Sequence, residues 1–296
     1  MPPKSARYIT PSLLRLLSTT DSYISHLTRC LSTASGIDTT LLTISYTLTL
    51  LSSQLTRALR AQYESLALSL VSKASDVLLP GETIFAEFEP PQTKLALLTA
   101  GTKALADLIS DFRIFLRLWG LLGIYAWARA TYFEPPKDAV VKALVWAQVA
   151  VNTAYQILEN GAYLAQHGVL RGERWGAKSQ ARLWAWSSRF WMGHVALEFL
   201  RLGRTWQTRD RAGEGLGIGV GQVAAEGVAE DDEKAVKVSR KEDMEAWWRT
   251  MRVNLAYAPM TLHWSMEDGC LNDTQVGALG MVAGFIGFGQ LWASTA

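Results

Sequence analysis

Residues 101–120 read GTKALADLISDFRIFLRLWG and show the clearest helical periodicity in the chain. At 100° per residue, the polar side chains of this stretch fall within an arc of about 160°. These polar residues are Lys103, Asp107, Ser110, Asp111, Arg113 and Arg117. The opposite face carries the large apolar residues Leu105, Leu108, Ile109, Phe112, Phe115, Leu116 and Trp119. The stretch therefore predicts an amphipathic helix.

An amphipathic helix of this kind can satisfy its two faces in two ways. It can lie in a membrane interface, where the apolar face enters the lipid and the charges stay in water. Arginine at the bilayer centre costs about 2.5–3.5 kcal/mol on insertion scales, so Arg113 and Arg117 argue against a simple span and are expected to contact lipid headgroups. The alternative is a helix that packs its apolar face on neighbouring helices, and the sequence alone leaves both open.

The second membrane signal is residues 276–294, which contain no charged residue. As a helix they would span roughly 28 Å, close to the hydrocarbon core of about 30 Å. Glycines would weaken a soluble helix by about 1 kcal/mol each, whereas in a bilayer they allow close helix contact. Gly280 and Gly284 have the spacing used for such contact. A transmembrane helix is therefore favoured over the core helix of a soluble bundle.

Residues 171–202 combine basic and tryptophan side chains. Arginine and tryptophan suit a membrane interface, where Arg174, Lys178, Arg182 and Arg189 would contact anionic headgroups. The same mixture could bind single-stranded nucleic acid or form a plain basic helix face. We favour the lipid interface and expect no nucleic-acid partner. A separate polar pair, Glu159 and Asn160, lies within an apolar helix and is expected to be buried, because a carboxylate there is costly without a partner.

The remaining composition divides the chain of 296 residues into four parts. We expect an N-terminal helical region at 1–90 and amphipathic, membrane-associated helices at 91–202. A glycine-rich and charged insertion at 203–243 has little to bury and is expected to be disordered. Residues 244–296 hold a further helix and the transmembrane segment. The predicted fold class is all-α: a helical membrane protein with interfacial amphipathic helices and a glycine-rich C-terminal transmembrane helix.

Signals for catalysis are poor. Cys30 and Cys270 are the only cysteines, which rules out a zinc site built on cysteine pairs. The four histidines are scattered, and none has a partner at the spacing of a metal or catalytic site. We therefore predict no catalytic, cofactor-binding or metal-binding residues, and no enzyme.

Three stretches of the sequence carry a resemblance to a known family. They are LISDFRIFLRLWGL at 108–121, YQILENGAYL at 155–164, and RVNLAYAPM at 252–260 followed by LHW at 262–264. In these stretches the chain resembles the peroxin-11 family, the membrane proteins of peroxisome proliferation and division. The size and composition of the 203–243 insertion indicate a fungal branch.

The resemblance implies a protein of the peroxisomal membrane that inserts an amphipathic helix, remodels and elongates the membrane, and promotes peroxisome fission and proliferation. It also implies self-association and contact with the phospholipid membrane. Further implied partners are the fission machinery, a dynamin-type GTPase with its adaptor, and the import receptor for peroxisomal membrane proteins. The alternative function is a membrane channel for small metabolites.

Overall fold

The computed structural model describes residues 11–75, 91–223 and 230–296, with side chains for 18–73, 91–208 and 241–296. Within these residues the structure is helical throughout and has no strand, as the sequence predicts. The α-helices are α1 (Pro11–Cys30), α2 (Ala34–Ser75), α3 (Lys94–Leu116), α4 (Gly120–Phe133), α5 (Ala139–Gln166), α6 (Ala177–Val223), α7 (Glu230–Ser265) and α8 (Asp273–Ser294). Two short 3₁₀ turns are η1 (Arg117–Trp119) and η2 (Glu173–Trp175).

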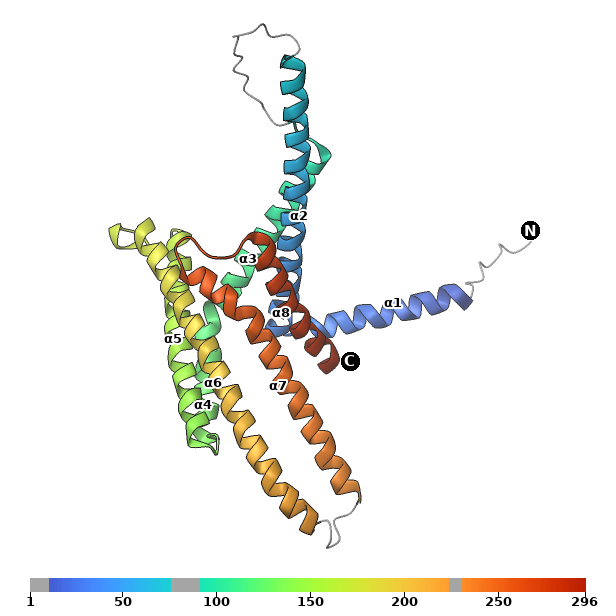
Figure 1. The fold of residues 1–296 in the computed structure, drawn as a ribbon, viewed down its shortest axis with the longest axis vertical. Helices are drawn as coiled ribbons and strands as arrows, with labels where there is room; N and C mark the ends of the chain where they lie inside the picture. Colours follow the sequence, from blue (N-terminus) through green and yellow to red (C-terminus); the bar gives the residue numbers. More distant parts are fainter. Residues whose placement is uncertain (1–10, 76–90, 224–229) are drawn as a thin grey trace, which may run out of the picture.

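The helices form two groups (Figure 1). In one group α2 packs along α3 and α8, and in the other α5 packs on α4 and α6, with α7 beside α6. The groups are joined through η1 and through the contact of α7 with α8. Helix α1 extends away from both groups and meets the end of α8, where His26 Nε2 lies 3.0 Å from the carbonyl oxygen of Trp292 (Figure 1).

Side-chain caps set where three of the helices begin. Thr93 accepts a hydrogen bond from the backbone N–H of Ala96 at the start of α3, and Asp138 accepts one from Val141 at the start of α5. Asn272 opens α8 with a reciprocal capping box. Each cap satisfies backbone N–H groups that the helix itself leaves unpaired.

Helix α8 packs against α2 through its glycines. A Cβ atom at Gly277 would lie 2.7 Å from the backbone nitrogen of Leu50, and one at Gly284 would lie 2.9 Å from Thr43 Cα. At Gly280 an added Cβ would overlap the ring of Tyr46. The structure therefore places both Gly280 and Gly284 in a close helix–helix contact that a larger residue would separate.

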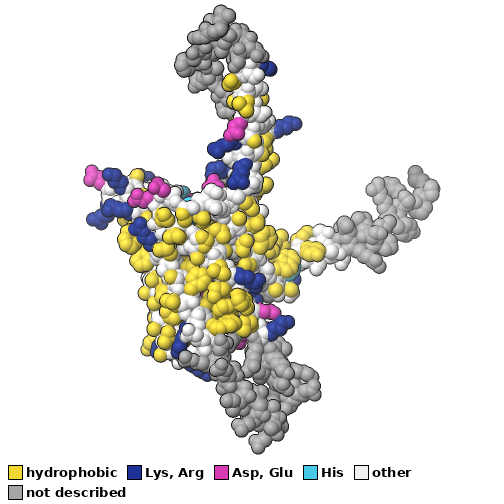
Figure 2. Space-filling model, in the orientation of Figure 1, with side chains coloured by type: hydrophobic (Ala, Val, Ile, Leu, Met, Phe, Trp, Pro, Cys, Tyr) yellow, Lys and Arg dark blue, Asp and Glu magenta, His cyan; other side chains and the backbone are white. Residues whose placement is uncertain are grey.

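The interior of the described residues is more polar than that of a soluble bundle. Thirteen apolar side chains are buried, against seventeen that are polar or charged, whereas soluble proteins bury mainly apolar residues. Large apolar side chains are instead exposed along every α-helix whose side chains are described. Figure 2 shows hydrophobic side chains across the centre of one face, with most of the charged ones toward its upper and lower ends. This arrangement suits apolar surroundings.

Among the described helices, α8 is long and apolar enough to cross a membrane. Only 28% of its most apolar window is buried within the chain, although the core helix of a soluble protein would be mostly buried. The structure therefore contains the predicted C-terminal helix, and its length, composition and exposure fit a membrane span.

The segment 203–243 differs from the expectation of disorder. The structure continues α6 to Val223 and begins α7 at Glu230, while residues 224–229 lie outside the described residues. A run of glycines lowers helix propensity but does not forbid a helix that extends from a packed one. The division of the chain into four parts stays a prediction.

Replacing Gly284 by alanine tests the contact between α8 and α2. The new Cβ would press on the α2 backbone, and overpacking of this kind costs about 1–3 kcal/mol. We expect Gly284→Ala to lower the Tm of the detergent-solubilised protein in a thermal unfolding experiment. Gly289→Ala is the matched control, because an added Cβ there meets nothing within 4 Å. An equal Tm for the two variants would contradict the close contact.

Candidate functional site

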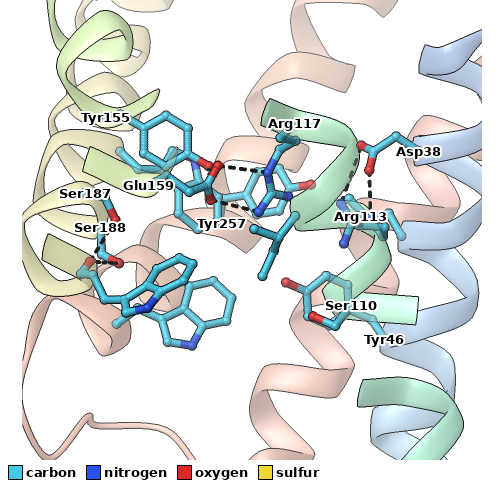
Figure 3. Close-up of a pocket in the computed structure, with 15 residues that line it drawn as sticks. Asp38, Tyr46, Ser110, Arg113, Arg117, Tyr155, Glu159, Ser187, Ser188 and Tyr257 are labelled. Atoms are coloured by element: carbon cyan, nitrogen blue, oxygen red, sulfur yellow. Dashed lines mark hydrogen bonds and ion pairs between the residues drawn. The ribbon is translucent and has the colours of Figure 1, made fainter. Parts of the chain in front are cut away.

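A cavity of about 590 Å³ lies between the two helix groups. Helices α2, α3, α5, α6 and α7 and the turn η1 contribute its walls. Figure 3 shows Tyr155, Glu159 and two serines on one side, with Asp38, Arg113, Ser110 and Tyr46 on the other. The cavity therefore holds two acidic and two basic side chains inside a bundle whose outer surface is apolar.

The ion pair between Arg117 and Glu159 joins η1 to α5 across the cavity. Arg117 donates from Nη2 to Oε1 of Glu159 at 2.8 Å and from Nε to Oε2 at 3.1 Å. The Tyr155 hydroxyl donates to the same carboxylate at 2.8 Å. Glu159 is only 4% exposed, so these partners replace the water that its charge has lost.

The neighbours of Glu159 on α5 hold the backbone of η1. Gln156 donates to the carbonyl oxygen of Arg117 at 2.9 Å, and Asn160 donates to that of Leu118 at 3.0 Å. The carbonyl oxygen of Arg117 also accepts the backbone N–H of Gly120, so the Gln156 amide is its second donor. A Cβ at Gly120 would overlap the Gln156 side chain, so the glycine permits this approach. We call this set, Arg117, Gly120, Gln156, Glu159 and Asn160, the α5 clamp.

The second basic residue of the cavity, Arg113, pairs within the other group of helices. Its Nε donates to Oδ1 of Asp38 on α2 at 2.9 Å, and Arg113 is 7% exposed. Arg113 and Arg117 were expected to contact headgroups, and in the structure both guanidinium groups pair with carboxylates of the same chain; the headgroup contact stays a prediction. The polar face of the 101–120 helix turns inward at these two positions.

The apolar face of α3 turns outward. Its small and polar residues Thr99, Thr102 and Ala106 are buried on the side of α2. Of the predicted membrane-inserting residues, Ile109 and Leu116 are half-buried. The other five are exposed: Leu105, Leu108, Phe112, Phe115 and Trp119. These five residues are therefore not buried by neighbouring helices among the described residues, and their insertion into lipid stays a prediction.

Three of the four remaining basic residues predicted to meet headgroups line one groove. Lys178, Arg182 and Arg189 border a hollow of about 760 Å³ together with Trp184, Trp186 and Trp264. The Arg189 guanidinium lies 5.0 Å from the centre of the Trp186 ring. Arg174 is exposed but lies outside this groove. The groove combines cations with tryptophans, as a headgroup contact requires.

A further polar cluster joins α5 to α6, and the sequence did not reveal it. Gln148 donates to Oε2 of Glu198 at 2.6 Å, and Arg201 pairs with the same carboxylate. Below it, Arg204 donates to Oδ2 of Asp138 at 2.7 Å, and this hydrogen bond lowers the pKa of Asp138. Glu198 lies in an apolar stretch of the sequence. An isolated carboxylate in such a stretch predicts burial with a partner, as it did for Glu159. Within the described residues, no group of three His, Cys, Asp or Glu side chains could hold a metal ion.

Removing one partner of the α5 clamp should leave a buried charge without compensation. We expect Glu159→Ala to cost about 3–5 kcal/mol of unfolding free energy. The double variant Glu159→Gln with Arg117→Met removes both charges and should cost less. Lys103→Ala is the control, because its pair with Asp107 is 66% exposed on both sides and should contribute under about 1 kcal/mol. Denaturant unfolding in detergent measures all three, and a Glu159→Ala cost equal to that of Lys103→Ala would refute the clamp.

Comparison with known proteins identifies the family. The family model described as Peroxisomal biogenesis factor 11 (PEX11) matches residues 92–292, which include α3, the α5 clamp and most of α8. An uncharacterized protein of the yeast Schizosaccharomyces pombe is 25% identical over 186 residues, which are 62% of this chain and 73% of that protein. No solved structure matches the chain. The chain belongs to the PEX11 family of peroxisome biogenesis factors, which is not a known enzyme family, and it is a peroxisomal membrane protein with a role in peroxisome proliferation and division.

Proposed function

We propose that this protein remodels and elongates the peroxisomal membrane by inserting the outward face of α3, and that it thereby promotes fission. The observation that carries the proposal is the inversion of α3. Large apolar side chains from Leu105 to Trp119 face away from the protein, while small and polar ones face α2. A face with no protein partner among the described residues is available to lipid.

The ion pairs of Arg113 and Arg117 remove the main objection to insertion. An unpaired arginine would hold this helix at the headgroup level. Here both charges are turned inward and neutralised by Asp38 and Glu159, so the apolar face can enter the leaflet without them. Full burial of one large apolar side chain contributes about 1.5–3 kcal/mol, so half-burial of the five exposed ones contributes on the order of 4–8 kcal/mol. Insertion into one leaflet expands it relative to the other and favours curvature.

Other helices of the described chain support an embedded position. Residues 39–56 of α2 and 276–294 of α8 contain no charged side chain. Residues 143–165 of α5 contain one, Glu159, which is buried in the α5 clamp. Self-association through further apolar faces, recruitment of a dynamin-type GTPase with its adaptor, and recognition by the membrane-protein import receptor belong to the same proposal.

Charged substitutions on the outward face test the wedge. We expect Leu108→Asp with Phe112→Asp to abolish tubulation of liposomes by the reconstituted full-length protein, because two carboxylates cannot enter the leaflet. Leu68→Asp with Leu70→Asp is the matched control on the distant part of α2, where both leucines are also exposed. Electron microscopy of the liposomes counts the tubules. The wedge is refuted if the first variant tubulates as well as the unmodified protein, or if the control loses tubulation equally.

The basic groove of α6 makes a separate prediction. Each lysine or arginine near an anionic surface contributes about 1 kcal/mol to binding. We expect Lys178→Ala with Arg182→Ala to weaken binding to vesicles that contain phosphatidylserine by about 10- to 30-fold, with the loss fading in high salt. Arg57→Ala with Arg60→Ala removes the same charge from the exposed part of α2 and should have little effect. Vesicle co-sedimentation measures the binding of both variants. If the α2 variant lost more binding than the α6 variant, α2 rather than the basic groove would contact the anionic lipid.

A metabolite channel is the second candidate, because Glu159, Arg113 and Arg117 line one interior cavity as that function requires. Planar-bilayer recordings with purified protein test it. Loss of a reproducible current on Glu159→Gln would favour a channel, and the absence of any current from the folded protein would oppose it.

A further inference from the structure

The interior cavity has a lining that suits a ligand carrying both charges. The charges of its two carboxylates and two guanidinium groups cancel. The net charge of the lining therefore favours neither a purely anionic nor a purely cationic ligand. The remaining lining is aromatic or hydroxyl-bearing, with Leu42 and Ile114 as the only aliphatic side chains. A volume of about 590 Å³ lies within the range of ligand sites, about 300–1,000 Å³.

One wall of the cavity is aromatic. Trp191 of α6 lies 5.5 Å from the rings of both Tyr257 and Trp264 on α7, and 6.5 Å from the ring of Tyr155 on α5. The Glu159 carboxylate lies beside Tyr155. Aromatic faces attract quaternary ammonium groups, which cannot donate hydrogen bonds, and a nearby carboxylate adds to the attraction.

The opposite side of the cavity offers hydrogen-bond donors. Arg117 uses Nε and Nη2 for Glu159, and the described residues give its Nη1 no hydrogen-bond partner. Ser110 and Tyr46 lie beside Arg113 at the same side (Figure 3). Guanidinium and hydroxyl donors of this kind recognise phosphate oxygens.

We propose that the cavity binds a phosphocholine headgroup, with the ammonium against the aromatic wall and the phosphate toward Arg113 and Arg117. The source we commit to is a membrane phospholipid, because the protein belongs to a membrane and the cavity adjoins a second hollow. Leu42 and Tyr257 also line this smaller hollow of about 270 Å³ between α2, α7 and α8. Its wall is mixed: Val253, Ala283 and Ile286 offer apolar contact to the start of an acyl chain, beside the polar Thr39, Arg249, Thr250, Asn254 and Gln290. The proposal rests on the membrane location of the protein and not on the wedge.

Lipid retention by the purified full-length protein tests the headgroup. The protein in maltoside detergent is mixed with equal amounts of phosphatidylcholine, phosphatidic acid and phosphatidylglycerol, and native mass spectrometry counts the bound lipids. We expect one phosphatidylcholine per chain, preferred about tenfold or more over the other two. Equal retention of all three, a preference for the anionic lipids, or no retained lipid would each overturn the proposal. Soluble glycerophosphocholine, which has the headgroup but no acyl chains, serves as a competitor. If it displaced phosphatidylcholine at equal concentration, the ligand would be the soluble compound and not the membrane lipid.

Substitutions at Tyr257 test the aromatic wall. We expect Tyr257→Leu to weaken phosphatidylcholine retention by about 3- to 30-fold, whereas Tyr257→Phe, which keeps the ring, should retain it. Leu108→Asp with Phe112→Asp, the wedge variant, should bind the lipid normally, so failure of the wedge and failure of this site give different results. If Tyr257→Leu does not fold, the headgroup preference of the unmodified protein still decides. Equal weakening by the leucine and phenylalanine variants would refute cation–π recognition.

Discussion

The structure depends on the neutralisation of one buried carboxylate. Glu159 lies in an otherwise uncharged stretch of α5, and a lone charge at such a position would cost several kcal/mol. Arg117 compensates it, and Gln156 and Asn160 donate hydrogen bonds to backbone carbonyl groups of the 3₁₀ turn. The requirement for a partner therefore fixes the point at which α3 ends, the direction in which α4 continues, and the face of α3 that turns inward.

This inward turn explains why the outer surface is apolar. Once Arg113 and Arg117 are committed to Asp38 and Glu159, the opposite side of the same helix must face away from the protein. The close contact of α8 with α2 follows the same logic, because the glycines of α8 admit Leu50, Tyr46 and Thr43 of α2 at short range, while Val282 and Phe285 of α8 face outward. In water such an inversion would be unfavourable, and in lipid it satisfies both the backbone and the side chains.

Two surface features and one interior cavity have different proposed roles. The outward face of α3 has the shape and chemistry for contact with lipid chains, and the basic groove on α6 has those for contact with headgroups. The balanced cavity between the helix groups is lined by the α5 clamp itself, so a ligand there would touch the residues that join the two groups. Binding in the cavity and the position of α3 are thereby physically connected through Arg117.

The sequence by itself determined the helical class, the apolar C-terminal helix, the amphipathic pattern of 101–120 and the burial of Glu159, because these follow from periodicity and from the cost of charge in apolar surroundings. It identified the glycines of α8 from their spacing. Only the tertiary structure decided that Arg113 and Arg117 point inward, because their partners Asp38 and Glu159 lie 75 and 42 residues away in the sequence. The Gln148–Glu198 contact was missed for the related reason that its two partners lie 50 residues apart in the sequence. Periodicity defines which residues share a face of a helix, and the long-range ion pairs decide which face meets the protein and which stays exposed.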